Sequence, residues 1–186
     1  LDTRSCPGGA ARRLRRSSLP TAAHGGGWYD AVRMSYHSAH LTHDAARNVV
    51  WRVIAEHLAR WISPDAAVLE LGAGYCDWIN HVRAARRVAT DIWPEVGQHA
   101  APGVETMVLD AGRDMARLPD AGFDTVLASN LLEHFEPDAV AVLVTHVARV
   151  LKPGGRFLMV QPNFRYAYRS YFDDYTHRSI FTDVSL

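Results

Sequence analysis

The stretch Val68-Leu69-Glu70-Leu71-Gly72-Ala73-Gly74 indicates more about the fold than any other part of the chain. A short apolar run that ends at two glycines is typical of a buried strand followed by a sharp turn. Glycine has no Cβ, so the backbone can turn there and approach a ligand closely. Glu70 at the strand end can accept hydrogen bonds from a cationic amine. The same glycine pattern also occurs in strand-to-helix turns that bind nothing.

Strands and helices are expected to alternate on both sides of this stretch. Apolar residues at helical spacing, Val49, Val50 and Val53 among them, predict a helix from Asp44 to Ile62 with one buried face and Thr42 as its N-cap. Two more helices are predicted over 76–85 and 137–151, and strands over 67–71, 87–91, 104–109, 123–129 and 156–161. This order predicts an α/β fold, a three-layer αβα sandwich around a Rossmann-like, mostly parallel sheet.

Acidic residues follow two further predicted strands. Asp91 ends the strand that lies about 20 residues beyond the glycines, where an acid commonly accepts the hydroxyls of a ribose. Asp110-Ala111 follows the next strand, in a place suited to contact with an adenine amino group. Each aspartate can also be a turn residue that caps its own backbone. The carboxyl ends of parallel strands share one edge of the sheet, so we expect the three acids to converge there.

The succession of motifs resembles class I S-adenosylmethionine-dependent methyltransferases. The resemblance covers roughly residues 44–161 and is carried by Val68 to Gly74, Thr90-Asp91, Asp110-Ala111, the block from Phe123 to His134, and Leu151 to Phe157. It implies S-adenosylmethionine as cofactor and methyl transfer, a transferase reaction, as the activity. It departs from many members at Tyr75-Cys76, where they have a third small residue.

The resemblance also implies roles for individual residues. Glu70, Gly72, Ala73 and Gly74 would surround the methionine part of the cofactor, and Asp91 would hold the ribose hydroxyls. The adenine and the sulfonium end would be held by a second group, namely Ile92, Trp93, Asp110, Ala111, Asn130 and Leu131. Tyr29, Arg33 and Tyr36 lie where related enzymes have a lid over the cofactor, although ordinary surface packing accounts for them equally well.

Catalytic residues are harder to assign because methyl transfer from a sulfonium requires chiefly alignment and exclusion of water. His134, His177 and Asp174 are our candidates for a general base. A structural role for His134 is the competing interpretation. The aromatic residues between 163 and 177 suit a small sugar or phenolic acceptor, or they pack a helix against the sheet. His37, His40 and His43 are spaced by three, but Asp44 is the only carboxylate at ligand spacing and the helix is expected to start at Thr42 between them, so no metal site is predicted.

Two other functions remain open at this point. A nicotinamide-dependent oxidoreductase would share the glycine turn and the ribose acid, but Asp77 stands in place of its third glycine. A truncated, non-catalytic cofactor-binding domain is the other alternative, because only 25 residues follow Gln161. We expect strands six and seven of the family's sheet to be absent, and Thr182 to cap a final helical turn. The fifth strand would then be an exposed edge through which the chain associates with itself.

Composition limits the partners and the location. Twenty basic and twenty acidic residues cancel, so no attraction to nucleic acid or to an anionic membrane is indicated. The two cysteines, Cys6 and Cys76, form no disulfide framework and fit a reducing cytoplasm. Residues 1–27 are rich in Arg, Gly and Ser and are expected to be a flexible tail, with the methyltransferase domain over 28–186.

Overall fold

Five parallel strands form one sheet in the computed structural model, which describes residues 44–186. The sheet order is β3-β2-β1-β4-β5, and every neighbouring pair is parallel. The strands are β1 (Ala67–Leu71), β2 (Arg86–Asp91), β3 (Val104–Val108), β4 (Phe123–Ser129) and β5 (Leu151–Val160). Strand order reverses between β1 and β4, which creates a crevice at the carboxyl ends of these two strands.

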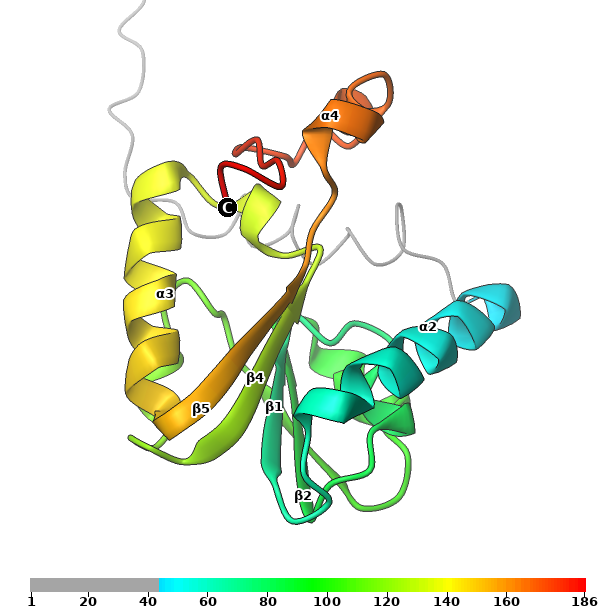
Figure 1. Cartoon of the computed structure of the whole chain (residues 1–186), viewed down its shortest axis with the longest axis vertical. Helices are drawn as coiled ribbons and strands as arrows, with labels where there is room; N and C mark the ends of the chain where they lie inside the picture. The colour runs from blue at the N-terminus through cyan, green and yellow to red at the C-terminus, as the bar shows by residue number, and fades with distance from the viewer. Residues whose placement is uncertain (1–43) are drawn as a thin grey trace, which may run out of the picture.

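Helices cover both faces of this sheet, as Figure 1 shows. Helix α2 (Ala45–Leu58) lies on one side and contributes Trp51 and Ala55 to a buried apolar cluster with β1 and β2. Helix α3 (Pro137–Val150) lies on the other side and contributes Leu143, Val147 and Val150 to a second cluster with β1 and β4. The predicted three-layer αβα sandwich with a Rossmann-like parallel sheet is therefore confirmed.

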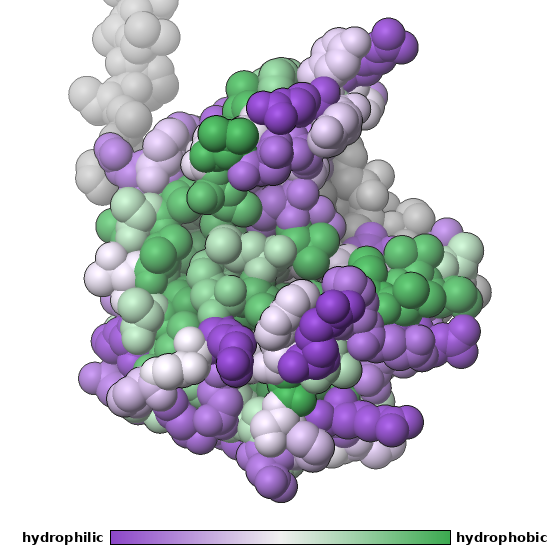
Figure 2. Space-filling view, viewed as in Figure 1, coloured by the Kyte–Doolittle hydropathy of each residue, from purple (hydrophilic) through white to green (hydrophobic). Residues whose placement is uncertain are grey.

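Helix α2 differs from its predicted form in two respects. Its N-cap is Asp44, whose Oδ1 accepts the N–H of Ala46 at 2.8 Å; the predicted cap, Thr42, lies outside the described residues. The prediction that Val49, Val50 and Val53 are buried is wrong, because each is more than half exposed. Trp51 and Ala55 occupy the face toward the sheet instead, and Figure 2 shows a hydrophobic area on the outer part of α2.

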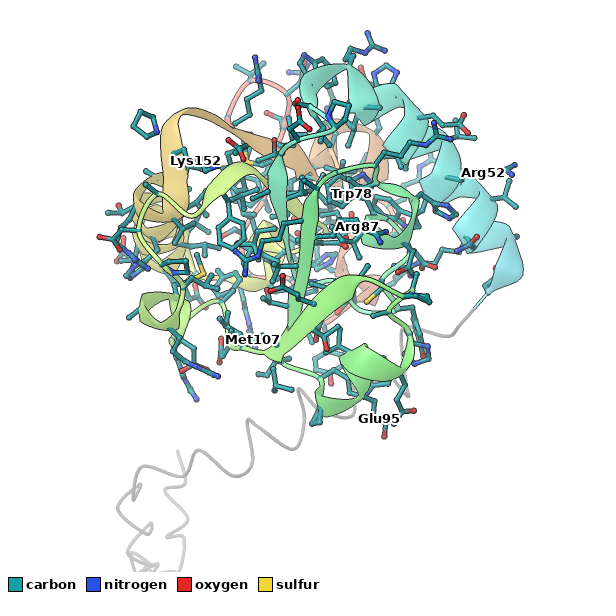
Figure 3. All side chains as sticks on the ribbon, turned by 90° about the horizontal axis from the view of Figure 1, so that it is seen from below. Arg52, Trp78, Arg87, Glu95, Met107 and Lys152 are labelled. Atoms are coloured by element: carbon teal, nitrogen blue, oxygen red, sulfur yellow. The ribbon has the colours of Figure 1, made fainter. Side chains whose placement is uncertain are left out.

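The helix predicted over 76–85 is also wrong. Turns occupy 74–78, and only the short 3₁₀ helix η2 (Ile79–His81) follows them. Cys76 adopts a left-handed conformation with a φ of 56°, which interrupts a helix at its first residue. The N–H of Ile79 donates to Glu70 Oε2 at 3.2 Å, so a side chain from β1 takes the place of a helical carbonyl. Trp78 is thereby buried in the interior, in contrast to the peripheral Arg52 and Glu95 (Figure 3).

The chain after α3 also departs from the predicted boundaries. Strand β5 begins directly at Leu151 rather than at residue 156, and a register shift in its pairing with β4 accommodates the segment around Gly154, whose φ is 78°. A short helix, α4 (Phe164–Ala167), and the 3₁₀ helix η6 (Tyr171–Asp173) follow. The hydroxyl of Thr182 accepts the N–H groups of Val184 and Ser185 in a last turn.

No strand follows β5 within residues 44–186, so β5 forms one edge of the sheet in this part of the chain. Likewise, none of the helices described there is long and apolar enough to cross a membrane. Several predictions concern residues outside the described range. These are the flexible tail over 1–27, the lid residues Tyr29, Arg33 and Tyr36, and the histidines at 37, 40 and 43.

Candidate functional site

A cavity of about 880 Å³ opens at the carboxyl ends of the strands. Its walls come from the segments that directly follow β1, β2, β3 and β4, so four separate parts of the sequence meet there. Its size falls within the range that small-molecule and cofactor pockets occupy, roughly 300–1,000 Å³. The predicted residues that line it are Glu70, Gly72, Ala73, Gly74, Asp91, Ile92, Asp110, Ala111, Asn130 and Leu131.

The glycine turn after β1 requires its glycines. Gly72 and Gly74 have φ values of 69° and 51°, in the left-handed region that side chains with a Cβ rarely occupy. A Cβ on Gly72 would also lie 3.0 Å from Cδ1 of Leu131. The turn therefore leaves open space along the cavity wall, where a ligand can reach the backbone.

Asp91 connects the end of β2 to the glycine turn. Its Oδ2 accepts the N–H of Gly74, and its Oδ1 accepts the N–H of Trp93, both at 2.8 Å. The carboxylate thus acts as the turn residue that the competing interpretation predicts, and it also lines the cavity. A carboxylate can accept several hydrogen bonds, so a carboxylate on the cavity wall can also accept hydroxyl groups of a ligand.

Glu70 is a buried acid at the end of β1, and only 3% of its surface is exposed. Burial raises its pKa well above the usual value, and the carboxylates of Asp77 and Asp91 raise it further. The N–H of Ile79 and the guanidinium of Arg47 act in the opposite direction on the same pKa. A cationic group bound in the cavity would stabilise the ionised form, which makes Glu70 a suitable partner for an ammonium.

The third acid, Asp110, lies two residues beyond the end of β3. Its Oδ1 accepts the N–H of Gly112 at 2.8 Å, and its Oδ2 lies 3.8 Å from Nε of Arg113. Ile92 and Ala111 line the adjoining wall. Trp93 is the one predicted cofactor residue that does not line the cavity. Its ring stacks instead on His99, with a centroid distance of 5.1 Å and an angle of 19°.

The candidate catalytic residues gather at another part of the cavity. His134 and His177 line it, and their ring centroids lie 5.0 Å apart. Asp174 does not line the cavity, but its Oδ2 lies 3.8 Å from Nε2 of His177. Residues that are 40 or more positions apart in the sequence therefore meet at one end of the pocket.

Glu133, which is not among the predicted site residues, joins this group. It lies in the 3₁₀ helix η5 (Leu132–His134) directly after β4, and its side chain is 1% exposed. Its Oε2 has no hydrogen-bond partner among the described residues. Burial, together with the nearby carboxylate of Asp174, raises the pKa of Glu133 to about 7. The sequence shows the Glu-His pair, but it does not show that the glutamate is buried.

The aromatic segment over 163–177 follows neither prediction as a whole. Tyr175 lines the cavity, as an acceptor wall requires. Tyr171 is buried, and its hydroxyl donates to the carbonyl of Ser179 at 2.5 Å. Tyr166, Tyr168 and Phe172 are more than half exposed, so they do not pack a helix against the sheet.

Helix α2 and the turn after β1 supply further cavity residues that the sequence patterns do not indicate. Asp77 is buried there, and its Oδ2 lies 2.9 Å from Nε of Arg47 on α2. Trp51 and Trp78 form apolar parts of the wall. Asp77 occupies the position of the third glycine of a dinucleotide-binding turn. That glycine allows the helix to pack closely on the strand, whereas here the side chain of Asp77 fills the space and pairs with Arg47. No local pattern identifies Arg47 as its partner.

Comparison with known proteins identifies relatives of this chain. The family described as "Methyltransferase domain" matches residues 69–159. A sarcosine/dimethylglycine N-methyltransferase of Halorhodospira halochloris is 30% identical over 129 residues, which are 64% of this chain and 45% of that protein. This chain therefore spans about half the length of that curated relative.

Solved structures with the same fold are numerous. A SAM-dependent methyltransferase from Archaeoglobus fulgidus superposes with a TM-score of 0.63 at 19% identity, over 74% of this chain and 63% of that one. The DhpI-SAM-HEP complex superposes with a TM-score of 0.57 at 25% identity, over 83% of this chain and 74% of that one.

Proposed function

We propose that this chain, which belongs to the class I S-adenosylmethionine-dependent methyltransferases, binds S-adenosylmethionine and transfers its methyl group to a small molecule. The observation that carries this proposal is the convergence of Glu70, Asp91 and Asp110 on one cavity. These acids come from the tips of β1, β2 and β3, and each suits a different polar part of one elongated nucleoside ligand.

The residues present fit such a ligand. The buried carboxyl of Glu70 would pair with the ammonium of the methionine part, beside the backbone of Gly72 and Gly74. Asp91 would accept the ribose hydroxyls, since its carboxylate lines the same cavity. The adenine would pack on Ile92 rather than on Trp93, which does not line the cavity. The other residues in contact with the ligand would be Asp110, Ala111, Asn130 and Leu131.

The chemistry then depends on alignment. Bound S-adenosylmethionine supplies a methyl group on a sulfonium, which is already activated for displacement by a nucleophile. The protein has to hold the acceptor in line and keep water out. We place the acceptor at the end of the cavity lined by His134 and His177. A neutral imidazole there, or Asp174 beside it, would take the proton that a hydroxyl or ammonium acceptor loses.

The acceptor is proposed as a small molecule with an amine or a hydroxyl group. The curated relative is named for sarcosine and dimethylglycine, which supports a small amine. A sugar or phenolic acceptor rests on the aromatic segment, of which only Tyr175 lines the cavity. A ring-shaped acceptor is therefore supported by one aromatic side chain rather than by the whole segment.

Calorimetric titration with S-adenosylhomocysteine and with NAD tests the cofactor. We expect binding of the first and none of the second. Asp91→Asn should weaken S-adenosylhomocysteine binding about 10- to 100-fold, since it removes hydrogen bonds to a charged group. Asp65→Asn, a matched change at an exposed position, should leave the affinity unchanged. Preference for NAD, or equal affinity of all three proteins for S-adenosylhomocysteine, would contradict the proposal.

A further inference from the structure

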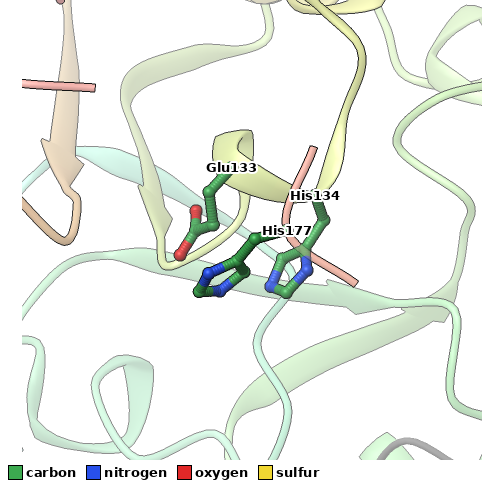
Figure 4. Close-up of side chains that lie close together, drawn as sticks. All are labelled: Glu133, His134 and His177. Atoms are coloured by element: carbon green, nitrogen blue, oxygen red, sulfur yellow. The ribbon is translucent and has the colours of Figure 1, made fainter. Parts of the chain in front are cut away.

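The pair of histidines beside the cavity is held by hydrogen bonds that determine which ring nitrogen carries the proton. Nδ1 of His177 lies 2.6 Å from the carbonyl oxygen of Tyr171. A carbonyl oxygen can only accept, so Nδ1 of His177 carries a proton, and in the neutral imidazole Nε2 carries the lone pair. Figure 4 shows the imidazole of His177 beside the side chains of Glu133 and His134.

His134 is held in the same tautomer through two further residues. Its Nδ1 lies 2.8 Å from the hydroxyl of Thr176, and that hydroxyl donates to Oδ1 of Asp174 at 2.5 Å. Because the hydroxyl proton of Thr176 is directed at the carboxylate, Nδ1–H of His134 is the donor to Thr176. Nε2 of His134 therefore also carries a lone pair.

The third member of the cluster is the buried carboxylate of Glu133. Its Oε2 lacks a hydrogen-bond partner among residues 44–186, and its side chain is 1% exposed. A buried carboxylate oxygen without a partner is costly unless it meets a proton or a cation. The backbone of Glu133 is anchored, because its carbonyl accepts the N–H groups of Arg178 and Ser179 at 2.6 and 3.0 Å.

These three side chains each offer one ligand atom, and the atoms lie within 4.8 Å of one another. Metal-bound N and O atoms, at about 2.0–2.2 Å from the ion, lie roughly 3–3.5 Å apart. Side-chain rotations that shift the ligand atoms by about an ångström would therefore complete a site. Metal sites that keep a coordination position open often have two imidazoles and one carboxylate as ligands. In such sites the other ring N–H of each histidine donates to an oxygen, as it does here.

We propose that Glu133, His134 and His177 bind a divalent transition-metal ion, such as Zn²⁺ or Co²⁺, at the acceptor end of the cavity. Imidazole ligands favour such ions over Mg²⁺ and Ca²⁺, which take oxygen ligands. With the ion bound, both imidazole lone pairs are ligands, so Asp174 rather than a histidine would take the proton that the acceptor loses. The open coordination positions would take oxygen or nitrogen atoms of the acceptor, which favours an acceptor with two neighbouring donor groups. This role of the ion rests on the proposed methyl transfer, whereas binding of the ion itself does not.

Titration of the full chain, free of any affinity tag, with Co²⁺ tests the site by visible absorption. We expect one tightly bound Co²⁺ per chain, which Zn²⁺ displaces and Mg²⁺ does not. Glu133→Gln and His177→Ala should each abolish the absorption. Thr176→Val keeps the shape but removes the acceptor of His134 Nδ1–H, and should weaken Co²⁺ binding about 10-fold or more.

Two controls distinguish this site from Co²⁺ binding elsewhere on the chain and from loss of folding. A chain that carries His37→Ala, His40→Ala and His43→Ala should keep the absorption band. Each variant is also titrated with S-adenosylhomocysteine, which reports folding and the cofactor site without the metal. Wild-type protein that binds S-adenosylhomocysteine but no Co²⁺ overturns the metal site and leaves the proposed function intact. A band that persists in His177→Ala, or that disappears with the three N-terminal histidines, also overturns it.

Discussion

Glu70 places a carboxyl group in the interior, where the folded protein favours its protonated form. Its pKa is raised in the folded state by burial and by Asp77 and Asp91, and is lowered less by Arg47. The unfolded chain ionises at a lower pH than the folded one. The free energy of unfolding therefore falls as the pH rises above the unfolded value, until the folded-state pKa is passed. The residue costs stability at neutral pH and would regain it when a cationic ligand binds.

Glu70→Gln should separate these two effects. The variant keeps an oxygen for the N–H of Ile79 but cannot ionise, so its free energy of unfolding should be less dependent on pH and at least equal to that of the wild type at about pH 7.5. Its affinity for S-adenosylhomocysteine should fall about 10- to 100-fold, because the charged partner of the ammonium is lost. Urea unfolding at about pH 5 and 7.5 and calorimetric titration measure the two outcomes. A less stable variant with unchanged affinity would contradict both.

Gly72 and Gly154 form a matched pair for testing the glycine turn. Both have positive φ, at 69° and 78°, but only at Gly72 would a Cβ meet a neighbour. Gly154→Ala should cost about 1–2 kcal/mol, the penalty of the left-handed conformation, and leave S-adenosylhomocysteine binding unchanged. Gly72→Ala should cost more and also weaken binding, because Leu131 must move at the cavity wall. Denaturant unfolding and calorimetry compare the two, and equal losses of stability with equal affinities would argue against a close backbone approach.

The segment from η6 to Ser179 places His177 at the cavity by a few buried hydrogen bonds. Tyr171 donates to the carbonyl of Ser179, and Oγ of Ser179 donates to the carbonyl of Phe135 at 2.6 Å. Ser179 is 5% exposed, so these bonds are shielded from water. Most of the aromatic side chains of this segment are exposed, which makes the hydrogen bonds its main attachment.

Ser179→Ala should loosen this segment selectively. It leaves the carbonyl of Phe135 without its buried donor, at a cost of about 1–3 kcal/mol. Amide hydrogen exchange should become faster over residues 174–181 and stay slow in β1 and β4. Ser185→Ala, in the exposed last turn, serves as the control and should change neither region. Uniformly faster exchange would show that the segment and the core unfold together.

Strand β5 is an edge strand of the sheet, because it pairs only with β4 among the described strands. Met159 on this strand is 40% exposed, and Figure 2 shows hydrophobic surface over this face of the protein. An apolar edge strand is a template for pairing with another chain. We therefore expect the 186-residue polypeptide to associate with itself through β5.

Sedimentation velocity across micromolar concentrations tests this expectation. The wild-type chain should show a concentration-dependent increase in sedimentation coefficient, and Met159→Lys should suppress it, because a charge at an edge opposes pairing. Val142→Lys places the same charge on an exposed apolar position of α3 and should have no effect. A monomer at every concentration would contradict self-association.

Local sequence patterns determined the five strands, two of the three predicted helices, and their order along the chain. Apolar runs closed by glycine or aspartate specify the strands, and the alternation with helices specifies a parallel sheet, because consecutive parallel strands need a crossover. Since parallel strands end at one edge, the convergence of Glu70, Asp91 and Asp110 follows from their positions at the strand ends. Short-range hydrogen bonds and the spacing of apolar residues suffice for this level of structure.

Only the tertiary structure decided which side chains are buried against which. The outward face of α2, the turns in place of a helix at 76–85, and the stacking of Trp93 on His99 depend on contacts between segments far apart in the chain. The meeting of Glu133 and His134 with His177 has the same origin, since more than 40 residues of chain separate them. Burial and the tautomer of a histidine are properties of the surrounding atoms, and these atoms are brought together only when the chain has folded.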